Sequence, residues 1–432
     1  MKRCILSIFL LCSVNVFSQD KMQWFADAKL GIFIHWGIYA VNGIDESWSF
    51  HNKKISYGDY LKQLNGFTAK NYHPEEWAEL IKQSGARYAV MTSKHHDGVA
   101  LWNTSMNDFS VPKKTPAAKD VLTPFVNALR KNNIRAALYF SLIDWSYPDY
   151  PGFLKDSARY DAIADTVRWN RFLKFCHGQI RELSDQFNPD LFWFDGDWEH
   201  SADEWKAAGI RKMILDHNPN AIINGRLQGF GDYDTPEQNF PVSKPNLKYW
   251  ELCMTTNDSW GYQQRDTNYK TPAEIISIFA DAISMGGNLL LDIGPKEDGS
   301  IPREQKFILT EIGKWTKKHS EAIYNTIAGL PQGHFYGPTS LSKDSLSLYL
   351  FLPAKTSGDI MIKGLDSKIE SVTVVGSNAP LRHKIVGKIS WSSVPGLVYI
   401  RMPESEVDQY MSVVKVKLKD PLKLYRGKGG FN

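Results

Sequence analysis

Short apolar runs alternate with segments of helical periodicity from about residue 57 to residue 325, and several of the runs end in a polar residue. The clearest run is Leu-Phe-Trp-Phe at 191–194, which leads directly into Asp195. Alternation of this kind is typical of a parallel sheet whose strands are joined by helices. About seven strands can be counted, so the pattern predicts an irregular (β/α)8-like barrel.

The residues that follow the predicted strands have side chains that can transfer protons, bind ligands or form hydrogen bonds. They are His35, the pair His95 and His96, Asp144, Asp195, Arg226 and Glu251. In a (β/α)8 barrel the carboxyl ends of all strands open at one mouth, so these side chains are expected to surround one cup. Tryptophans lie beside them at positions 36, 48, 102, 193, 198 and 260. Because aromatic faces cover the apolar C–H surfaces of ligands, the combination indicates carbohydrate chemistry.

The pattern changes after Pro331. Residues 345–352 alternate between apolar and polar side chains, and further short runs occur at 369–375, 387–391, 397–402 and 412–418. This predicts an all-β domain, most simply a sandwich. We therefore divide the chain into a catalytic (β/α)8-like domain over residues 19–330 and a C-terminal β-sandwich domain over residues 331–432, and we assign the second domain to stability or substrate shaping.

The first residues have the features of a secretory signal. Lys2 and Arg3 precede an apolar run over 4–16, and Ser18 is small enough for signal-peptidase cleavage. We predict that residues 1–18 are a signal peptide and that the protein is periplasmic or secreted. The run is shorter than the roughly 20 apolar residues of a transmembrane helix, and no comparable run follows, so no integral membrane segment is expected.

Charge and cysteine content exclude two classes of protein. The whole chain has a formal net charge of +4, and removal of Lys2 and Arg3 with the signal lowers it to +2. A nearly neutral chain is not expected to bind nucleic acid. Two of the four cysteines leave with the signal, so Cys176 and Cys253 remain. These two cannot form a disulfide framework or a four-cysteine zinc site.

Asp195 and Glu251 are the leading catalytic candidates. Side chains two apart on a strand share a face, so if Trp193 points into the barrel mouth, Asp195 does too. Its alternative role is that of a helix cap. Glu251 follows Tyr249 and Trp250 in the same manner, and its alternative role is a structural carboxylate paired with a cation. Glycoside hydrolysis uses two carboxyl groups, and we therefore predict that these two act together.

The His95-His96-Asp97 run resembles a metal-binding motif only superficially. Adjacent residues of an extended chain point in opposite directions, and the spacings that place two imidazoles on one face are missing. We predict no metal and no cofactor. Imidazoles both donate and accept hydrogen bonds, so His35, His95 and His96 suit the binding of sugar hydroxyls. Arg226 offers only donors, to sugar oxygens or to a carboxylate.

Five separate blocks of the sequence resemble the α-L-fucosidases of glycoside hydrolase family 29. They are 24–25 with 30–37, then 88–98 (Tyr-Ala-Val-Met-Thr-Ser-Lys-His-His-Asp-Gly), 189–198, 250–253 with 259–262, and 286–295. The resemblance covers nearly all of the chain after the signal. It implies an irregular (β/α)8-like catalytic domain, a C-terminal β-sandwich, a retaining mechanism, and a fucosylated oligosaccharide or glycoconjugate as the substrate.

The resemblance also implies roles for individual residues. Asp195 matches the family nucleophile, and Glu251 lies where many relatives carry the acid/base. The positions that match fucose-binding residues are His35, His95, His96, Trp193 and Arg226, and we add Trp48 and Tyr139 as further substrate contacts. Ser47-Trp48-Ser49 stands where many relatives have Glu-Trp-Tyr. This departure is expected to change the contacts to one sugar hydroxyl.

Together these features predict an exported exo-acting α-L-fucosidase that removes terminal fucose with retention. Two alternatives stay open. An α-L-galactosidase acts on a sugar that differs by a hydroxyl on C6, and an apolar pocket discriminates weakly against an added hydroxyl. A fucose-binding protein without activity is the other alternative, and the presence of both Asp195 and Glu251 argues against it.

Overall fold

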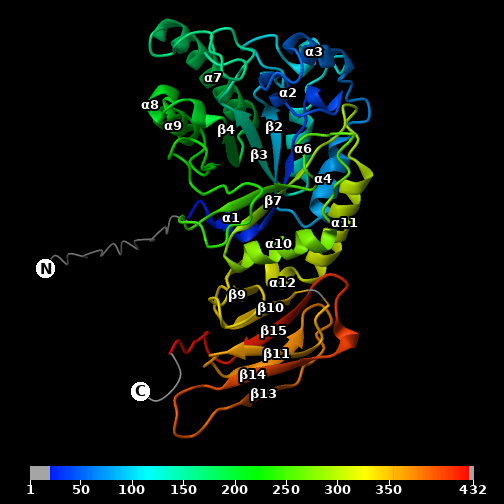
Figure 1. The fold of residues 1–432 in the computed structure, drawn as a ribbon, viewed down its shortest axis with the longest axis vertical. Helices are drawn as coiled ribbons and strands as arrows, with labels where there is room; N and C mark the ends of the chain where they lie inside the picture. The colour runs from blue at the N-terminus through cyan, green and yellow to red at the C-terminus, as the bar shows by residue number, and fades with distance from the viewer. Residues whose placement is uncertain (1–19, 354, 428–432) are drawn as a thin grey trace, which may run out of the picture.

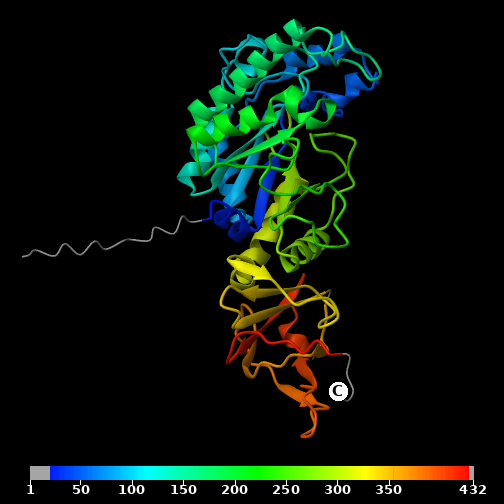
Figure 2. The same ribbon diagram turned by 90° about the vertical axis from the view of Figure 1, so that its left-hand side faces the viewer.

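The computed structural model describes residues 20–353 and 355–427. A larger unit of strands and helices lies above a smaller unit of strands (Figure 1), and Figure 2 shows the same two tiers from the side. The predicted signal peptide, residues 1–18, lies outside the described residues. None of the helices in the described part is long and apolar enough to cross a bilayer.

Seven parallel strands form the sheet of the larger unit. Their spatial order is β5-β4-β3-β2-β1-β7-β6. The strands are β1 (Leu30–Ile34), β2 (Tyr88–Lys94), β3 (Arg135–Ser141), β4 (Leu191–Asp195), β5 (Ile222–Ile223), β6 (Glu251–Thr255) and β7 (Asn288–Ile293). The longer helices between and after them are α4 (Pro74–Gln83), α6 (Leu122–Lys131), α7 (Thr166–Phe187), α9 (Ala207–His217), α10 (Pro272–Ser284) and α11 (Arg303–Lys318).

An irregular segment, residues 233–237, lies between β5 and β6 in place of an eighth strand. Isolated parallel bridges pair Asn224 with Tyr233, Asp234 with Trp250, and Glu237 with Cys253. The Glu251 amide donates to the Asp234 carbonyl at 2.9 Å. The prediction of an irregular (β/α)8-like barrel is therefore confirmed.

The alternation of side chains along β4 sets the direction of the residue that ends it. Leu191 and Trp193 belong to the apolar cluster inside the barrel, whereas Phe192 and Phe194 belong to the larger core that includes the helices. Asp195 is two residues beyond Trp193, so it continues the inward row at the carboxyl end of the strand.

The smaller unit is a sandwich of two antiparallel sheets, as predicted. The strand orders are β12-β15-β10-β9-β8 and β11-β14-β13. The strands are β8 (Thr326–Ala328), β9 (Thr339–Ser342), β10 (Ser347–Leu352), β11 (Gly358–Lys363), β12 (Ile369–Val374), β13 (His383–Val386), β14 (Leu397–Met402) and β15 (Ser412–Leu418). Since β8 already pairs into the first sheet, the boundary between residues 330 and 331 stays a prediction.

The strand predicted at 387–391 is wrong. Strand β13 ends at Val386, because Gly387 has a φ of +78°, which breaks the extended conformation. The other predicted runs of the sandwich coincide with β10, β12, β14 and β15 to within a few residues.

Strand β10 joins the two units because both of its faces are buried. Leu348 and Leu350 lie in the core of the sandwich, whereas Phe351 packs with the barrel. The Phe351 ring lies 6.2 Å from the ring of Trp315 on α11, and Trp315 Nε1 donates to the carbonyl of Met411 at 2.8 Å. One tryptophan thus connects a barrel helix to the sandwich.

Replacement of Trp315 by alanine is expected to destabilise the protein by about 3–5 kcal/mol, because it leaves a large cavity and an unpaired carbonyl. Chemical denaturation measures this change. The matched control is Lys317→Ala on the exposed face of the same helix, which should stay within about 0.5 kcal/mol of the wild type. Equal effects of the two substitutions would contradict the connecting role of Trp315.

Candidate active site

A cavity of about 130 Å³ opens at the carboxyl ends of the barrel strands. Its lining residues come from most of the strands and from the segment 233–237. They are Phe33, His35, Trp48, His95, Tyr139, Trp193, Asp195, Trp198, Arg226, Glu237 and Trp260. Seven of the nine predicted site residues are among them. The two that are not are His96 and Glu251.

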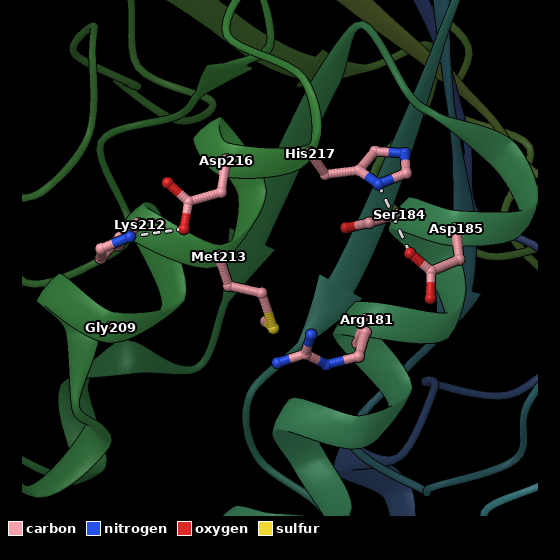
Figure 3. A pocket seen from close by; sticks show the side chains of 8 residues that line it. All are labelled: Arg181, Ser184, Asp185, Gly209, Lys212, Met213, Asp216 and His217. Atoms are coloured by element: carbon pink, nitrogen blue, oxygen red, sulfur yellow. Dashed lines mark hydrogen bonds and ion pairs between the residues drawn. The ribbon is translucent and has the colours of Figure 1, made fainter.

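A larger hollow of about 350 Å³ lies between α7 and α9, on the outside of the barrel (Figure 3). Four of its lining side chains form two pairs: Lys212 lies 2.5 Å from Asp216, and His217 lies 3.4 Å from Asp185. Its lining includes none of the predicted site residues. The cavity at the strand ends is therefore the better candidate for chemistry.

Asp195 is fixed at the base of the cavity by donors on both of its oxygens. Oδ1 accepts a hydrogen bond from Arg226 Nη1 at 2.8 Å, and Oδ2 accepts one from the Tyr139 hydroxyl at 2.9 Å. Burial, together with the charge of Asp195, raises the pKa of Tyr139 well above its usual value, so the phenol keeps its proton and remains a donor. The carboxylate is thus held in one orientation.

Arg226 connects two carboxylates. While Nη1 donates to Asp195, Nη2 donates to Glu237, and the guanidinium carbon lies 4.6 Å from the centre of the Trp193 ring. The Asp195 side chain is 12% exposed and that of Glu237 is 38% exposed. One carboxylate therefore lies deep in the cavity and the other at its entrance.

Glu237 was not predicted from the sequence. It lies on the irregular segment, which has no strand-like pattern, and it follows Pro236. The signal that was available was the long stretch between Arg226 and Trp250, which carries several carboxylates and no helical periodicity. Phe33, on β1, was also missed as part of the lining.

Glu251 lies behind Trp193 and not in the cavity, so its predicted position is wrong. The sequence indicated a strand that ends before Glu251, but strand β6 begins at this residue. Glu251 is therefore at the opposite end of its strand from Asp195. Its Oε1 accepts hydrogen bonds from Trp193 Nε1 at 3.1 Å and from the Tyr233 hydroxyl at 3.2 Å, and its Oε2 accepts one from the Tyr88 hydroxyl.

The hydrogen bonds of His96 fix its tautomer. The Ser141 hydroxyl gives its single proton to the carbonyl of Ile143 at 2.7 Å, so His96 Nδ1, 2.6 Å from the same oxygen, must be the donor. Burial lowers the pKa of His96 well below its usual value, which leaves the ring neutral. Nε2 then carries a lone pair, 3.7 Å from Asp195 Oδ2, and has no partner among the described residues. A ligand hydroxyl that donates to Nε2 would satisfy it.

The other two histidines also use Nδ1 for a protein partner. His35 Nδ1 lies 2.7 Å from Asp292 Oδ1, and His95 Nδ1 contacts the Ser47 hydroxyl. Burial lowers the pKa of both imidazoles well below its usual value. Ser47 therefore holds a histidine of the site in place.

Among the described residues, no group of three or more His, Cys, Asp or Glu side chains is arranged to hold a metal ion. The site consists instead of aromatic walls, neutral imidazoles, one guanidinium and two carboxylates. Such a set binds hydroxyl groups through its donors and acceptors and covers apolar C–H surfaces with its rings.

Comparisons with known proteins indicate one family. The alpha-L-fucosidase family model matches residues 13–321. Tissue alpha-L-fucosidase from Macaca fascicularis is 31% identical over 414 residues, which cover 88% of this chain and 84% of that protein, and the Homo sapiens enzyme is 30% identical over 423 residues, which cover 90% and 86%.

Solved structures are similar over almost the whole length. Alpha-L-fucosidase isoenzyme 1 from Paenibacillus thiaminolyticus has a TM-score of 0.83 at 30% identity, over 93% of this chain and 99% of that one. An alpha-L-fucosidase from Bacteroides thetaiotaomicron has a TM-score of 0.82 at 28% identity, over 93% and 97%. That structure holds a trapped covalent intermediate formed with 2-fluoro-fucosyl fluoride by a glutamate-to-glutamine mutant.

Because Glu251 is buried, its raised pKa can be tested through the pH dependence of protein stability. Burial raises its pKa from 4.5 to about 7, so between these values the folded protein binds more protons than the unfolded chain and stability falls as the pH rises. Glu251→Gln is nearly isosteric and does not titrate. Relative to this variant, the wild type should lose about 2–3 kcal/mol of unfolding free energy between about pH 5 and pH 8. Urea unfolding at both pH values measures the free energy of unfolding of each protein. If the difference between the wild type and Glu251→Gln is the same at both pH values, the raised pKa of Glu251 is contradicted.

Proposed function

The chain belongs to the alpha-L-fucosidase family of glycoside hydrolases, and we propose that it removes terminal α-L-fucosyl residues with retention, using Asp195 as nucleophile and Glu237 as acid/base. The observation that carries this proposal is the pair of carboxylates that Arg226 binds at one cavity. Retaining glycosidases place their two carboxyl groups about 5–5.5 Å apart, and two carboxylates on one guanidinium are compatible with that spacing.

The size and shape of the cavity support action on a terminal sugar. A volume of about 130 Å³, closed at its base by the barrel interior, suits one sugar residue and not a continuous chain. Phe33 and Trp260 provide apolar surface for the methyl group on C5 of fucose. An α-L-galactoside carries a hydroxyl on this methyl carbon, C6, and that hydroxyl would find no hydrogen-bond partner on these rings.

In the first step, Asp195 attacks the anomeric carbon while Glu237 protonates the glycosidic oxygen. The bond between carbon and leaving oxygen breaks, and a β-configured ester forms with Asp195. In the second step, Glu237 takes a proton from water, the water oxygen attacks the anomeric carbon, and Asp195 leaves as a carboxylate. The exposed position of Glu237 suits both the departing group and the entering water.

The proposed substrate is a fucosylated oligosaccharide or glycoconjugate. We further propose that the protein is exported to the periplasm or secreted, on the basis of the predicted signal over residues 1–18. Support for an extracellular location comes from plasma alpha-L-fucosidase of Homo sapiens, which is 29% identical over 376 residues and covers 78% of each chain.

Asp195→Ala is expected to lower kcat on an aryl fucoside by at least about 1000-fold while the protein folds normally. Azide should restore part of the turnover by taking the place of the carboxylate. Since it attacks the substrate directly, the product is β-L-fucosyl azide, which proton NMR identifies. The control is Asp197→Asn, a neighbouring carboxylate outside the cavity lining, which should remain active. An Asp195→Ala enzyme that keeps a third of the wild-type kcat would refute the assignment.

With azide, Glu237→Ala is expected to form a product of the opposite anomeric configuration to that formed by Asp195→Ala. Azide then attacks the fucosyl ester from the face that the leaving group vacated, so the product is α-L-fucosyl azide. Hydrolysis of a fucosyl oligosaccharide should fall by about 100-fold or more, whereas an aryl fucoside with an acidic phenol needs no proton in the first step and should be less affected. Glu251→Gln is the control. It should affect the oligosaccharide and the aryl fucoside equally and should form no α-L-fucosyl azide. If Glu251→Gln instead affects the oligosaccharide more and forms the azide, the acid/base is Glu251.

A further inference from the structure

Trp198 is the most exposed aromatic ring of the cavity lining. Half of its surface, 50%, is accessible, whereas Phe33, Tyr139 and Trp193 are buried. It lies three residues beyond Asp195, on a short 3₁₀ turn, η3 (Asp197–Glu199). A large apolar ring left in water at the entrance of a polar site is typical of a contact surface for a ligand.

The residue before Trp198 is fixed by hydrogen bonds from two other segments of the chain. Gly196 turns the chain with a φ of +80°, a conformation that favours glycine. The carbonyl of Asp197 then accepts hydrogen bonds from Trp205 Nε1 at 2.9 Å and from Gln228 Nε2 at 2.8 Å. The Asp197 carboxylate accepts a third from the amide of Gln228 at 2.7 Å.

The residue after Trp198 is fixed in the same manner. The Glu199 carboxylate accepts hydrogen bonds from Trp145 Nε1 at 3.3 Å and from the Tyr150 hydroxyl. Trp198 is therefore held on a braced turn although its ring is exposed. Because the residues on both sides are fixed, only the side chain of Trp198 has to be ordered when a ligand covers the ring, which lowers the entropy cost of binding.

The ring itself continues the wall of the cavity outwards. It is nearly parallel to the ring of Trp48, with an interplanar angle of 14° and centroids 6.4 Å apart, and it meets His96 edge-on at 5.9 Å. Glu237 is the other strongly exposed member of the lining, at 38%. The two exposed residues mark the side on which a ligand leaves the cavity.

We propose that Trp198 is the platform for the leaving group and makes the enzyme selective for fucosides whose aglycone is a pyranose ring. This inference rests on the proposed function. The acid must reach the glycosidic oxygen, so the ring bonded to that oxygen lies at the entrance that Glu237 and Trp198 share. A pyranose presents an apolar face of C–H bonds that a tryptophan ring covers, and its hydroxyls remain free for water and for the polar groups of the rim.

The test compares Trp198→Ala with the wild type on two substrates. One is a fucosyl-galactose disaccharide, and the other is α-L-fucosyl fluoride, whose leaving group is a single atom that cannot stack. We expect kcat/KM for the disaccharide to fall by about tenfold, as the loss of one aromatic contact implies, and kcat/KM for the fluoride to stay within about twofold. Trp198→Phe keeps a smaller aromatic ring, so its kcat/KM for the disaccharide should lie between the values of the wild type and of Trp198→Ala.

Trp391→Ala is the matched control, because Trp391 is 67% exposed but belongs to the sandwich. This substitution should leave kcat/KM unchanged for both substrates. Equal losses on the disaccharide and the fluoride in Trp198→Ala, or no loss on either, would overturn the platform role. If the wild type hydrolyses neither substrate, the proposed function itself fails, which is a different result. Circular dichroism and the melting temperature of each variant verify that the ring's removal leaves the fold intact.

Discussion

The site depends on the guanidinium of Arg226. Two carboxylates that share one cavity repel each other when both are ionised, and a cation between them relieves that repulsion. Arg226 does so with one nitrogen for Asp195 and another for Glu237. The guanidinium in turn lies over the Trp193 ring, and the Trp193 nitrogen is bound from behind by Glu251. Glu251 thus acts on the site through two other side chains, as a positioning residue, without being part of the lining.

The histidines follow a second common rule. Each of the three engages Nδ1 with a protein side chain: Asp292 for His35, Ser47 for His95 and Ser141 for His96. Burial disfavours the charged form of all three rings. A neutral imidazole with one nitrogen committed has only the other left for a ligand, in one fixed direction. The site therefore recognises where hydroxyl groups point and does not supply extra positive charge beside Arg226.

Sequence reasoning succeeded where the backbone is regular. The two-residue period of β4 places Trp193 and Asp195 on one face, and this could be predicted because a strand has only two faces. It failed where a strand boundary decided the outcome. Glu251 follows an apolar run that is not a strand, and β6 begins at the glutamate itself. Glu237 lies on a segment held by isolated bridges and interrupted by Pro236, for which no periodic pattern exists.

The two carboxylates lie on elements of different regularity, and their different tasks account for this. Asp195 ends a strand that is paired on both sides, with β3 and with β5, so its distance from the anomeric carbon is fixed by the sheet. A nucleophile needs this, because attack depends steeply on position. Glu237 must first give a proton to a departing group and then take one from water. Its segment is anchored to β6 by hydrogen bonds of Gln238 and Cys253 at 2.9 and 3.1 Å, yet leaves the carboxyl group exposed at the entrance. The irregular eighth position of the barrel is therefore where an acid that serves two partners can be anchored while remaining open to both.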